Sequence, residues 1–204
     1  MTFVITCFCC FPIMIHLLRC KFFFLIFVMS CPTQTTERNN LGGTIPDEIG
    51  ELSELRFLHM EEGRTSGPIP ESLGNLNNLL ELDMNFNELT GSIPENLFNL
   101  SNLLEFDLND NNLSGAIGPG IANMSSLTFI QLHRNELSGT IPPEIGALDR
   151  LIVATFDSNN FEDPMPEEVC RLREGDLRTL TSDCLDPESE TFVDCPVGCC
   201  TQCF

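Results

Sequence analysis

The chain has 204 residues, enough for one domain and little more. It carries 30 acidic and 10 basic side chains, giving a formal net charge of −20 at pH 7, and such a field would repel the backbone of a nucleic acid. The eleven Cys lie only near the two ends, up to Cys31 and again from Cys170. The chain therefore divides into an apolar head, a Cys-free body and a Cys-rich tail.

The head begins with a long apolar segment. Residues 3–29 are apolar except for Thr6 and three side chains that can carry positive charge, His16, Arg19 and Lys21. From Met14, a basic stretch, an apolar stretch (FFFLIFVM) and a polar exit (SCPTQT) follow one another as in a secretory signal. From Met1, the segment is long enough to span a bilayer, although each internal basic residue would cost about 2.5 to 3.5 kcal/mol at full depth. We expect residues 1–36 to be a signal peptide or a membrane anchor, unless the start of the chain is wrongly assigned.

The body repeats every 24 residues without an insertion. One apolar column has six members, Ile45, Ile69, Ile93, Ile117, Ile141 and Met165. A Gly stands two residues before the first five, and a Pro follows five of the six. Further columns of Leu and Ile keep the same register. A fixed period of this length is typical of a solenoid, in which each unit forms one coil.

Each unit contains a stretch with a period of two. Leu82 and Met84 alternate with polar Glu81, Asp83 and Asn85, which predicts a short strand with one face inward. Apolar residues spaced by three after each Pro predict a short helical turn on the opposite side. Stacked coils would bury one another and join their strands into a parallel sheet. The predicted inward residues are Leu58, Leu82, Phe106, Ile130 and Ala154.

An Asn column follows the strands. Its members are Asn39, Asn87, Asn111, Asn135 and Asn159. An Asn amide offers donors and an acceptor, so we expect this column to satisfy the backbone of adjacent coils rather than to bind a ligand. The second unit has Gly63 in this column and Thr65 where the others have Leu, which predicts weaker stacking there.

These segments resemble a known family. "LLELDMNFNELTGSIPENLFNLSN" and "LTFIQLHRNELSGTIPPEIGALDR" look like the plant-type leucine-rich repeat, LxxLxLxxNxLxGxIPxxLGxLxx. The resemblance implies an α/β fold, a right-handed leucine-rich repeat solenoid with a parallel sheet on its concave face and a second short strand near the GxIP step. It places the repeats at residues 37–172, without the usual paired-Cys cap before them. It also implies a receptor-like extracellular protein without a kinase, which binds peptides, proteins or glycans and is not an enzyme; any signalling would pass through a separate co-receptor.

The acidic tail, residues 173–204, is predicted to cap the array with disulfides. Six Cys stand here and just before it, Cys170, Cys184, Cys195, Cys199, Cys200 and Cys203. In an oxidising compartment they would be bonded to one another. The alternative is zinc, because CxxxCCxxC could supply thiolates at short spacing, but no second CxxC or partnered His accompanies it. We therefore expect no metal and no cofactor.

Three Asn-x-Ser sequons agree with a secreted or plasma-membrane glycoprotein. They begin at Asn99, Asn112 and Asn123, which we place on turns or on the outer side of the coils. Together with the head and the tail, they predict passage through the secretory pathway.

The outward strand positions are the candidate binding surface. The expected register brings four carboxylates together, Glu81, Asp83, Glu105 and Asp107. Phe57 and Phe129 would flank them as apolar anchors, with His59 and His133 nearby. One interpretation is a recognition surface for a cationic or polyhydroxyl partner; the other is a solvated face of a structural, matrix-type glycoprotein that has no selective ligand. The carboxylate spacing superficially suits a glycosidase, but an open sheet cannot exclude water, so we expect no enzyme activity.

Overall fold

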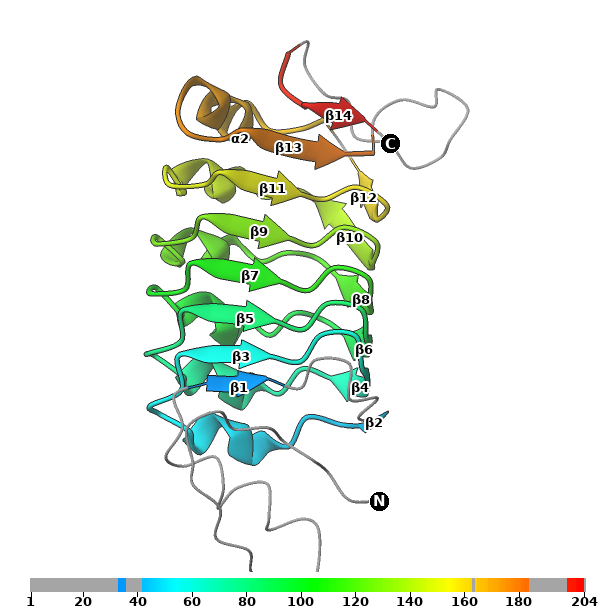
Figure 1. Cartoon of the computed structure of the whole chain (residues 1–204). Coiled ribbons are helices and arrows are strands. Elements are labelled where there is room, and N and C mark those ends of the chain that lie inside the picture. Colours follow the sequence, from blue (N-terminus) through cyan, green and yellow to red (C-terminus); the bar gives the residue numbers. More distant parts are fainter. Residues whose placement is uncertain (1–32, 36–41, 163, 184–197, 204) are drawn as a thin grey trace, which may run out of the picture.

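The computed structural model describes residues 33–35, 42–162, 164–183 and 198–203. Its coils stack in chain order, so that successive strands lie one above another (Figure 1). The main sheet has eight parallel strands. These are β1 (Thr33–Thr35), β3 (Phe57–His59), β5 (Glu81–Asp83), β7 (Glu105–Asp107), β9 (Phe129–Gln131), β11 (Val153–Thr155), β13 (Thr179–Ser182) and β14 (Gln202–Cys203). Their outward side is the predicted concave face.

A second parallel sheet of six strands runs beside the first. It contains β2 (Gly42–Gly43), β4 (Arg64–Pro68), β6 (Glu88–Gly91), β8 (Asn112–Gly115), β10 (Glu136–Thr140) and β12 (Asn160–Glu162). The side opposite the main sheet is built from short helices. These are η1 (Asp47–Glu51), η2 (Glu71–Asn75), η3 (Glu95–Asn99), η4 (Pro119–Asn123), η5 (Pro143–Ala147), α2 (Glu167–Arg171) and η6 (Leu172–Glu174). The expected sheet, second strand and helical turns are all present.

The core lies between these layers, where the sequence pattern places it. All five predicted inward residues are buried, with Leu58 at 2% and the other four at 0% exposure.

Phe98, in the η3 turn, occupies a column in which Gly74 stands one coil earlier. A Cβ at Gly74 would lie 2.2 Å from the Asn96 carbonyl oxygen, so this close approach of two turns requires Gly.

The Asn column forms the predicted ladder over four coils. Asn111 Nδ2 donates to the carbonyl oxygens of Met84 and Leu108 at 3.0 and 3.1 Å, and its Oδ1 accepts the Leu89 N–H at 3.0 Å. The other three described members, Asn87, Asn135 and Asn159, repeat this pattern. Each amide therefore joins its own coil to the preceding one, as buried backbone groups require.

Every repeat turns after its main strand through a left-handed residue, which the sequence pattern did not indicate. The five residues have φ of 49 to 57°, and they are Glu62, Phe86, Asp110, Arg134 and Ser158. Such a conformation is unusual for a residue other than Gly, Asn or Asp. The recurrence at each coil shows that stacking fixes the backbone here and leaves the side chain pointing away from the core.

The main sheet extends beyond both ends of the predicted repeat region. Strand β1 pairs with β3 although it precedes residue 37, and β13 and β14 continue the sheet beyond residue 172. The 24-residue period did not indicate these strands. Leu177 and Leu180 of the β13 segment are buried like the Leu columns of the repeats, but they follow Leu151 and Ala154 by 26 residues. The remaining apolar head, which we expect to be a signal or anchor, lies outside the described residues. Within the described part, no helix is long and apolar enough to cross a membrane.

A disulfide ties the tail to the last coil. Cys170 in α2 is bonded to Cys199, just before β14. Cys200 is disulfide-bonded as well. Cys184, Cys195 and the Cys203 side chain lie outside what the structure describes, so their bonding stays a prediction.

Candidate functional site

The register of the main sheet brings the predicted carboxylates together. Glu81 pairs with Glu105, and Asp83 pairs with Asp107, on neighbouring strands β5 and β7. Their environments nevertheless differ. Asp107 is only 4% exposed, whereas the other three are half-buried. We expected four carboxylates with similar exposure. Three of them lie at the surface, and the fourth, Asp107, is buried.

Asp107 is held by four neutral donors from three successive coils. Its Oδ1 accepts the backbone N–H and the Nδ2 of Asn109 at 3.1 and 2.6 Å. Its Oδ2 accepts Asn85 Nδ2 at 3.2 Å and Gln131 Nε2 at 2.8 Å. Burial raises the pKa of Asp107 to about 6, although these hydrogen bonds act to lower it. Asp107 is therefore a buried acceptor that joins three successive coils, and its contact with a ligand stays a prediction.

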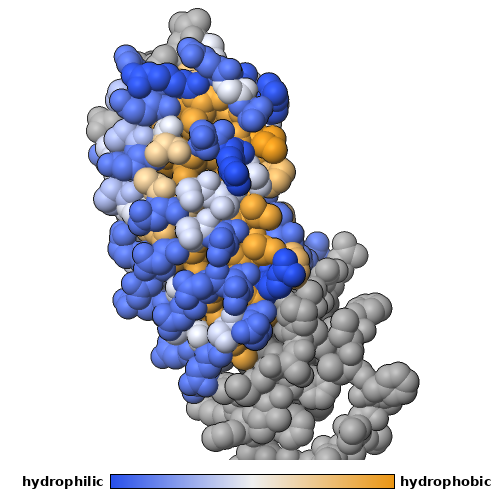
Figure 2. Space-filling view, turned by 90° about the vertical axis from the view of Figure 1, so that its left-hand side faces the viewer, coloured by the Kyte–Doolittle hydropathy of each residue, from blue (hydrophilic) through white to orange (hydrophobic). Residues whose placement is uncertain are grey.

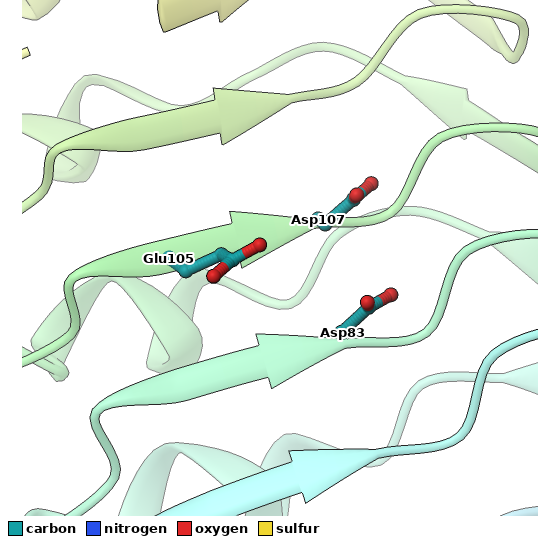
Figure 3. A group of neighbouring side chains, drawn as sticks. All are labelled: Asp83, Glu105 and Asp107. Carbon is teal, nitrogen blue, oxygen red and sulfur yellow. The ribbon is translucent and has the colours of Figure 1, made fainter. Parts of the chain in front are cut away.

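Glu105 completes the cluster with Asp83 and Asp107. Oxygens of the three groups lie within 4.8 Å of one another, and Figure 3 shows the Glu105 carboxylate directed along the face toward the two Asp side chains. Burial raises the Glu105 pKa first, and the charges of Glu81, Asp83 and Asp107 add to the effect. A metal ion would need Asp107 oxygens that already accept four hydrogen bonds. The donor set therefore fits a metal poorly.

The two predicted His sit at opposite ends of this surface. His59 Nε2 lies 3.0 Å from Glu81 Oε2, so Glu81 already has a neighbour that can balance its charge. His133 Nδ1 lies 2.9 Å from Thr155 Oγ1, and its Nε2 is 3.9 Å from Asp110 Oδ2. His133 is therefore beside a hydroxyl, that of Thr155, which is buried, and His59 is beside the Glu81 carboxylate.

The two Phe side chains that we predict as anchors are not the most exposed apolar groups of the described region. Phe57 and Phe129 face outward but are half-buried, and the Arg56 guanidinium lies over the Phe57 ring at 5.6 Å. The more exposed large apolar side chains in the described region are Phe86 at 51% and Leu104 and Ile152 at 36% each. Figure 2 shows the side of the molecule at which the main strands begin, where apolar surface runs between polar side chains. Leu104 and Ile152 stand one residue before β7 and β11. We did not predict them because their column lies outside the alternating strand pattern.

The sequons are accessible. Asn99, Asn112 and Asn123 are all exposed, at the ends of η3 and η4 and at the start of β8. None of them lies on the concave face. Glycans there would leave the carboxylate surface open, and their attachment stays a prediction.

Comparison with known proteins decides the family. A family model described as Leucine Rich Repeat matches residues 78–100, 102–124 and 126–148. This chain is a leucine-rich repeat protein. As in other leucine-rich repeat proteins, its scaffold is set by the inward columns, and the fold is typically non-enzymatic. A search among curated proteins found no match.

Solved structures similar to this leucine-rich repeat protein include plant receptors. The plant peptide hormone receptor RGFR1 in complex with RGF2 is 30% identical, with a TM-score of 0.71, over 82% of this chain and 25% of its own. The Arabidopsis receptor kinase HAESA, in complex with the peptide hormone IDA and the co-receptor SERK1, is 33% identical, with a TM-score of 0.65, over 70% and 24%. A plant ice-binding protein is 32% identical, with a TM-score of 0.61, over 71% and 45%. The chain thus spans about a quarter of the two receptor chains.

Proposed function

We propose that this protein is an extracellular or cell-surface recognition module that binds a peptide, protein or glycan ligand through the concave face. The observation that carries the proposal is the carboxylate surface of Glu81, Asp83 and Glu105 on an open sheet. Burial raises the pKa of Glu105, and the neighbouring charges of Glu81, Asp83 and Asp107 raise it further, so like charges lie close together on this face. A cationic partner would relieve the repulsion between these charges, and a hydroxyl-rich partner would donate hydrogen bonds to the same oxygens.

The structural neighbours support binding but not a particular ligand. One of them is a peptide hormone receptor in complex with RGF2, and another is HAESA in complex with a peptide hormone and a co-receptor. A third is an ice-binding protein, so the shared fold does not fix the function. The surface chemistry must therefore carry the argument. By analogy with HAESA, a separate co-receptor would transmit any signal.

The proposed compartment is the secretory pathway and the cell surface. The Cys170–Cys199 disulfide and the exposed sequons support it. Protein made through a secretory route should show glycans at Asn99, Asn112 and Asn123 and disulfides at most of the six tail Cys. Mass mapping under non-reducing conditions tests both, and free thiols or bound zinc at the tail would overturn the assignment.

A charge-matched pull-down tests binding through the concave face. The concave variant carries Glu81→Gln, Asp83→Asn and Glu105→Gln. The control carries Glu71→Gln, Glu95→Gln and Glu144→Gln, which remove three exposed acids from the helical side. A specific partner should be retained by the native protein and the control, be lost from the concave variant, and bind more weakly as salt screens the charges over about 10 Å at 0.1 M. Equal capture by all three proteins would favour the alternative, a structural matrix glycoprotein without a selective ligand.

A further inference from the structure

A pocket lies at the turns that connect the two sheets. Its volume of about 440 Å³ falls within the range of ligand pockets, about 300 to 1,000 Å³. Phe86 and Glu88 line it from one coil, Asp110 and Asn112 from the next, and Arg134 from the third. In Figure 1 these turns follow β5, β7 and β9 and lead into β6, β8 and β10. The three surface carboxylates of the concave face do not line this pocket.

Phe86 is an unusual residue for its place in the fold. Its backbone is left-handed, with φ of 49°, a costly conformation for a bulky residue, and its side chain is 51% exposed. The same column in the other described repeats holds only polar residues, Glu62, Asp110, Arg134 and Ser158. Neither core packing nor backbone geometry therefore accounts for an aromatic ring here. A contact at the surface would account for it.

Asn112 is the sequon residue that lines the same pocket. The equivalent residues of the other described repeats do not begin a sequon, and they are Arg64, Glu88, Glu136 and Asn160. Among the described repeats, the one sequon of this column therefore meets the one aromatic residue of the neighbouring column. The sequons at Asn99 and Asn123 lie at the ends of η3 and η4 and do not line the pocket.

The backbone on both sides of Asn112 is fixed by the Asn ladder. Asn111 Oδ1 accepts the Leu89 N–H at 3.0 Å, and the Leu113 N–H donates to Asn135 Oδ1 at 3.0 Å. A sugar attached to Asn112 would start from a defined position, which lowers the entropic cost of its contacts.

From this arrangement we propose that a glycan at Asn112 places its first sugar in the pocket, against the Phe86 ring. The C–H bonds of a sugar carry a small positive charge and pack on the negative face of an aromatic ring. Arg134 Nη1 donates to Asp110 Oδ1 at 3.3 Å, and the guanidinium stays largely exposed, so its other N–H groups can donate to a sugar oxygen.

The proposal rests on the proposed passage through the secretory pathway and assigns a seat to one of its glycans. Protein made without glycans lacks this contact, and Asn112 then behaves as any other exposed residue.

Site-resolved removal of the glycans tests the proposal. The full chain is produced through the yeast secretory pathway, and the folded protein is treated with peptide N-glycosidase F, which cleaves the bond between Asn and the first sugar. Mass spectrometry follows the conversion of each glycosylated Asn to Asp. A packed sugar must leave the ring before the enzyme can act. Phe86→Asn should therefore speed cleavage at Asn112 by about two- to tenfold and leave the rates at Asn99 and Asn123 unchanged.

The matched control is Ser158→Asn, which introduces the same residue in the same column outside the pocket. Asn tolerates the left-handed backbone, and neither substitution creates a sequon. Cleavage at Asn112 should keep its native rate in Ser158→Asn. Equal rates at Asn112 in the native protein and in Phe86→Asn would overturn the proposal.

A second measurement detects the contact directly. Ser101→Ala, Ser125→Ala removes the other two sequons, and endoglycosidase H trims the glycan at Asn112 to its first sugar. The ring current of Phe86 should shift C–H proton signals of this sugar upfield in NMR spectra, and Phe86→Asn should abolish the shift. Unshifted signals in the protein that retains Phe86 would overturn the proposal.

Further outcomes separate this proposal from the proposed compartment. A glycan at Asn99 and Asn123 but not at Asn112 would overturn the seat and leave the secretory assignment standing. Dimers of the glycosylated protein that Phe86→Asn abolishes would also overturn the seat, because a second copy would then cover the ring. Absence of glycans from all three sequons, together with free thiols in the tail, would overturn both proposals.

Discussion

The inward and outward sides of the main sheet obey different constraints. On β7, Phe106 is fully buried between two coils, whereas Glu105, its neighbour in sequence, faces outward among like charges. The inward columns repeat with the 24-residue period because every coil must cover the next. One outward column changes along the stack from Phe57 to Glu81 and Glu105 and then to Phe129. Scaffold and recognition can therefore vary independently on one set of strands.

Replacing Leu82 with Asp should cause the largest loss of stability, because Leu82 belongs to the inward side. An unpaired carboxylate would be placed in a core position with 0% exposure, and we expect a loss of more than about 4 kcal/mol in the free energy of unfolding. The matched control is Leu104→Asp at a position that is 36% exposed, which should cost much less because water still solvates the new charge. Urea denaturation followed by circular dichroism measures both. Similar midpoints for the two variants would refute the assigned register.

Asn111→Ala should have the next largest effect. It removes the partners of the Leu89 N–H and of the Met84 and Leu108 carbonyl groups, all of which are buried. We expect the free energy of unfolding to fall by about 2 to 4 kcal/mol. Asn112→Ala, at an exposed position next to it, should stay within about 0.5 kcal/mol of the native protein. Equal losses for the two changes would mean that the ladder has no special role.

The pH dependence of stability tests the buried member of the cluster. The folded pKa of Asp107 is about 6, above its ordinary value of 3.8, so its ionised form disfavours folding. The free-energy penalty of ionising Asp107 in the folded protein is absent below pH 3.8 and complete above pH 6. It amounts to at most about 3 kcal/mol. The native protein should therefore gain stability as the pH falls from 7 to 4, relative to Asp107→Asn, which lacks this titration. Parallel stability curves for the two proteins would contradict the assigned pKa.

Glu105→Gln should give the smallest change, a gain at neutral pH. The substitution removes repulsion with Glu81, Asp83 and Asp107. Because Glu105 is half-exposed and water screens its charge, the gain should not exceed about 1 kcal/mol. Glu95→Gln, exposed on the helical side, should produce no measurable shift. A loss of stability in Glu105→Gln would show that the cluster is not repulsive.

These expectations also mark what the sequence could predict. The period placed Leu82 in the core and Asn111 in the ladder, because only one stacking register buries every Leu column. It also placed Glu81, Asp83, Glu105 and Asp107 together, since register follows from the period.

The sequence could not show that Asp107 is buried. The exposure of Asp107 depends on how the side chains of Asn85, Asn109 and Gln131 pack over it. These side chains differ from coil to coil, so the repeat pattern does not indicate their packing. It likewise did not indicate that Leu104 and Ile152 remain exposed, or that β1 and β14 join the sheet. A strand that lacks the repeat residues pairs with the sheet only if the connecting segments bring it to the sheet edge, and the sequence pattern does not show their path.

Site-specific photo-cross-linking tests the central claim, that the concave face is the binding surface, most directly. A photoreactive phenylalanine analogue would replace Phe129 on the concave face, or Asn75 at the exposed end of η2 on the opposite side. After irradiation in a mixture of secreted proteins, we predict a covalent partner at position 129, none at position 75, and loss of the first when Asp83→Asn and Glu105→Gln are also present. Cross-linking of the same partner at position 75 would contradict the account. So would cross-linking at position 129 that persists when Asp83→Asn and Glu105→Gln are present.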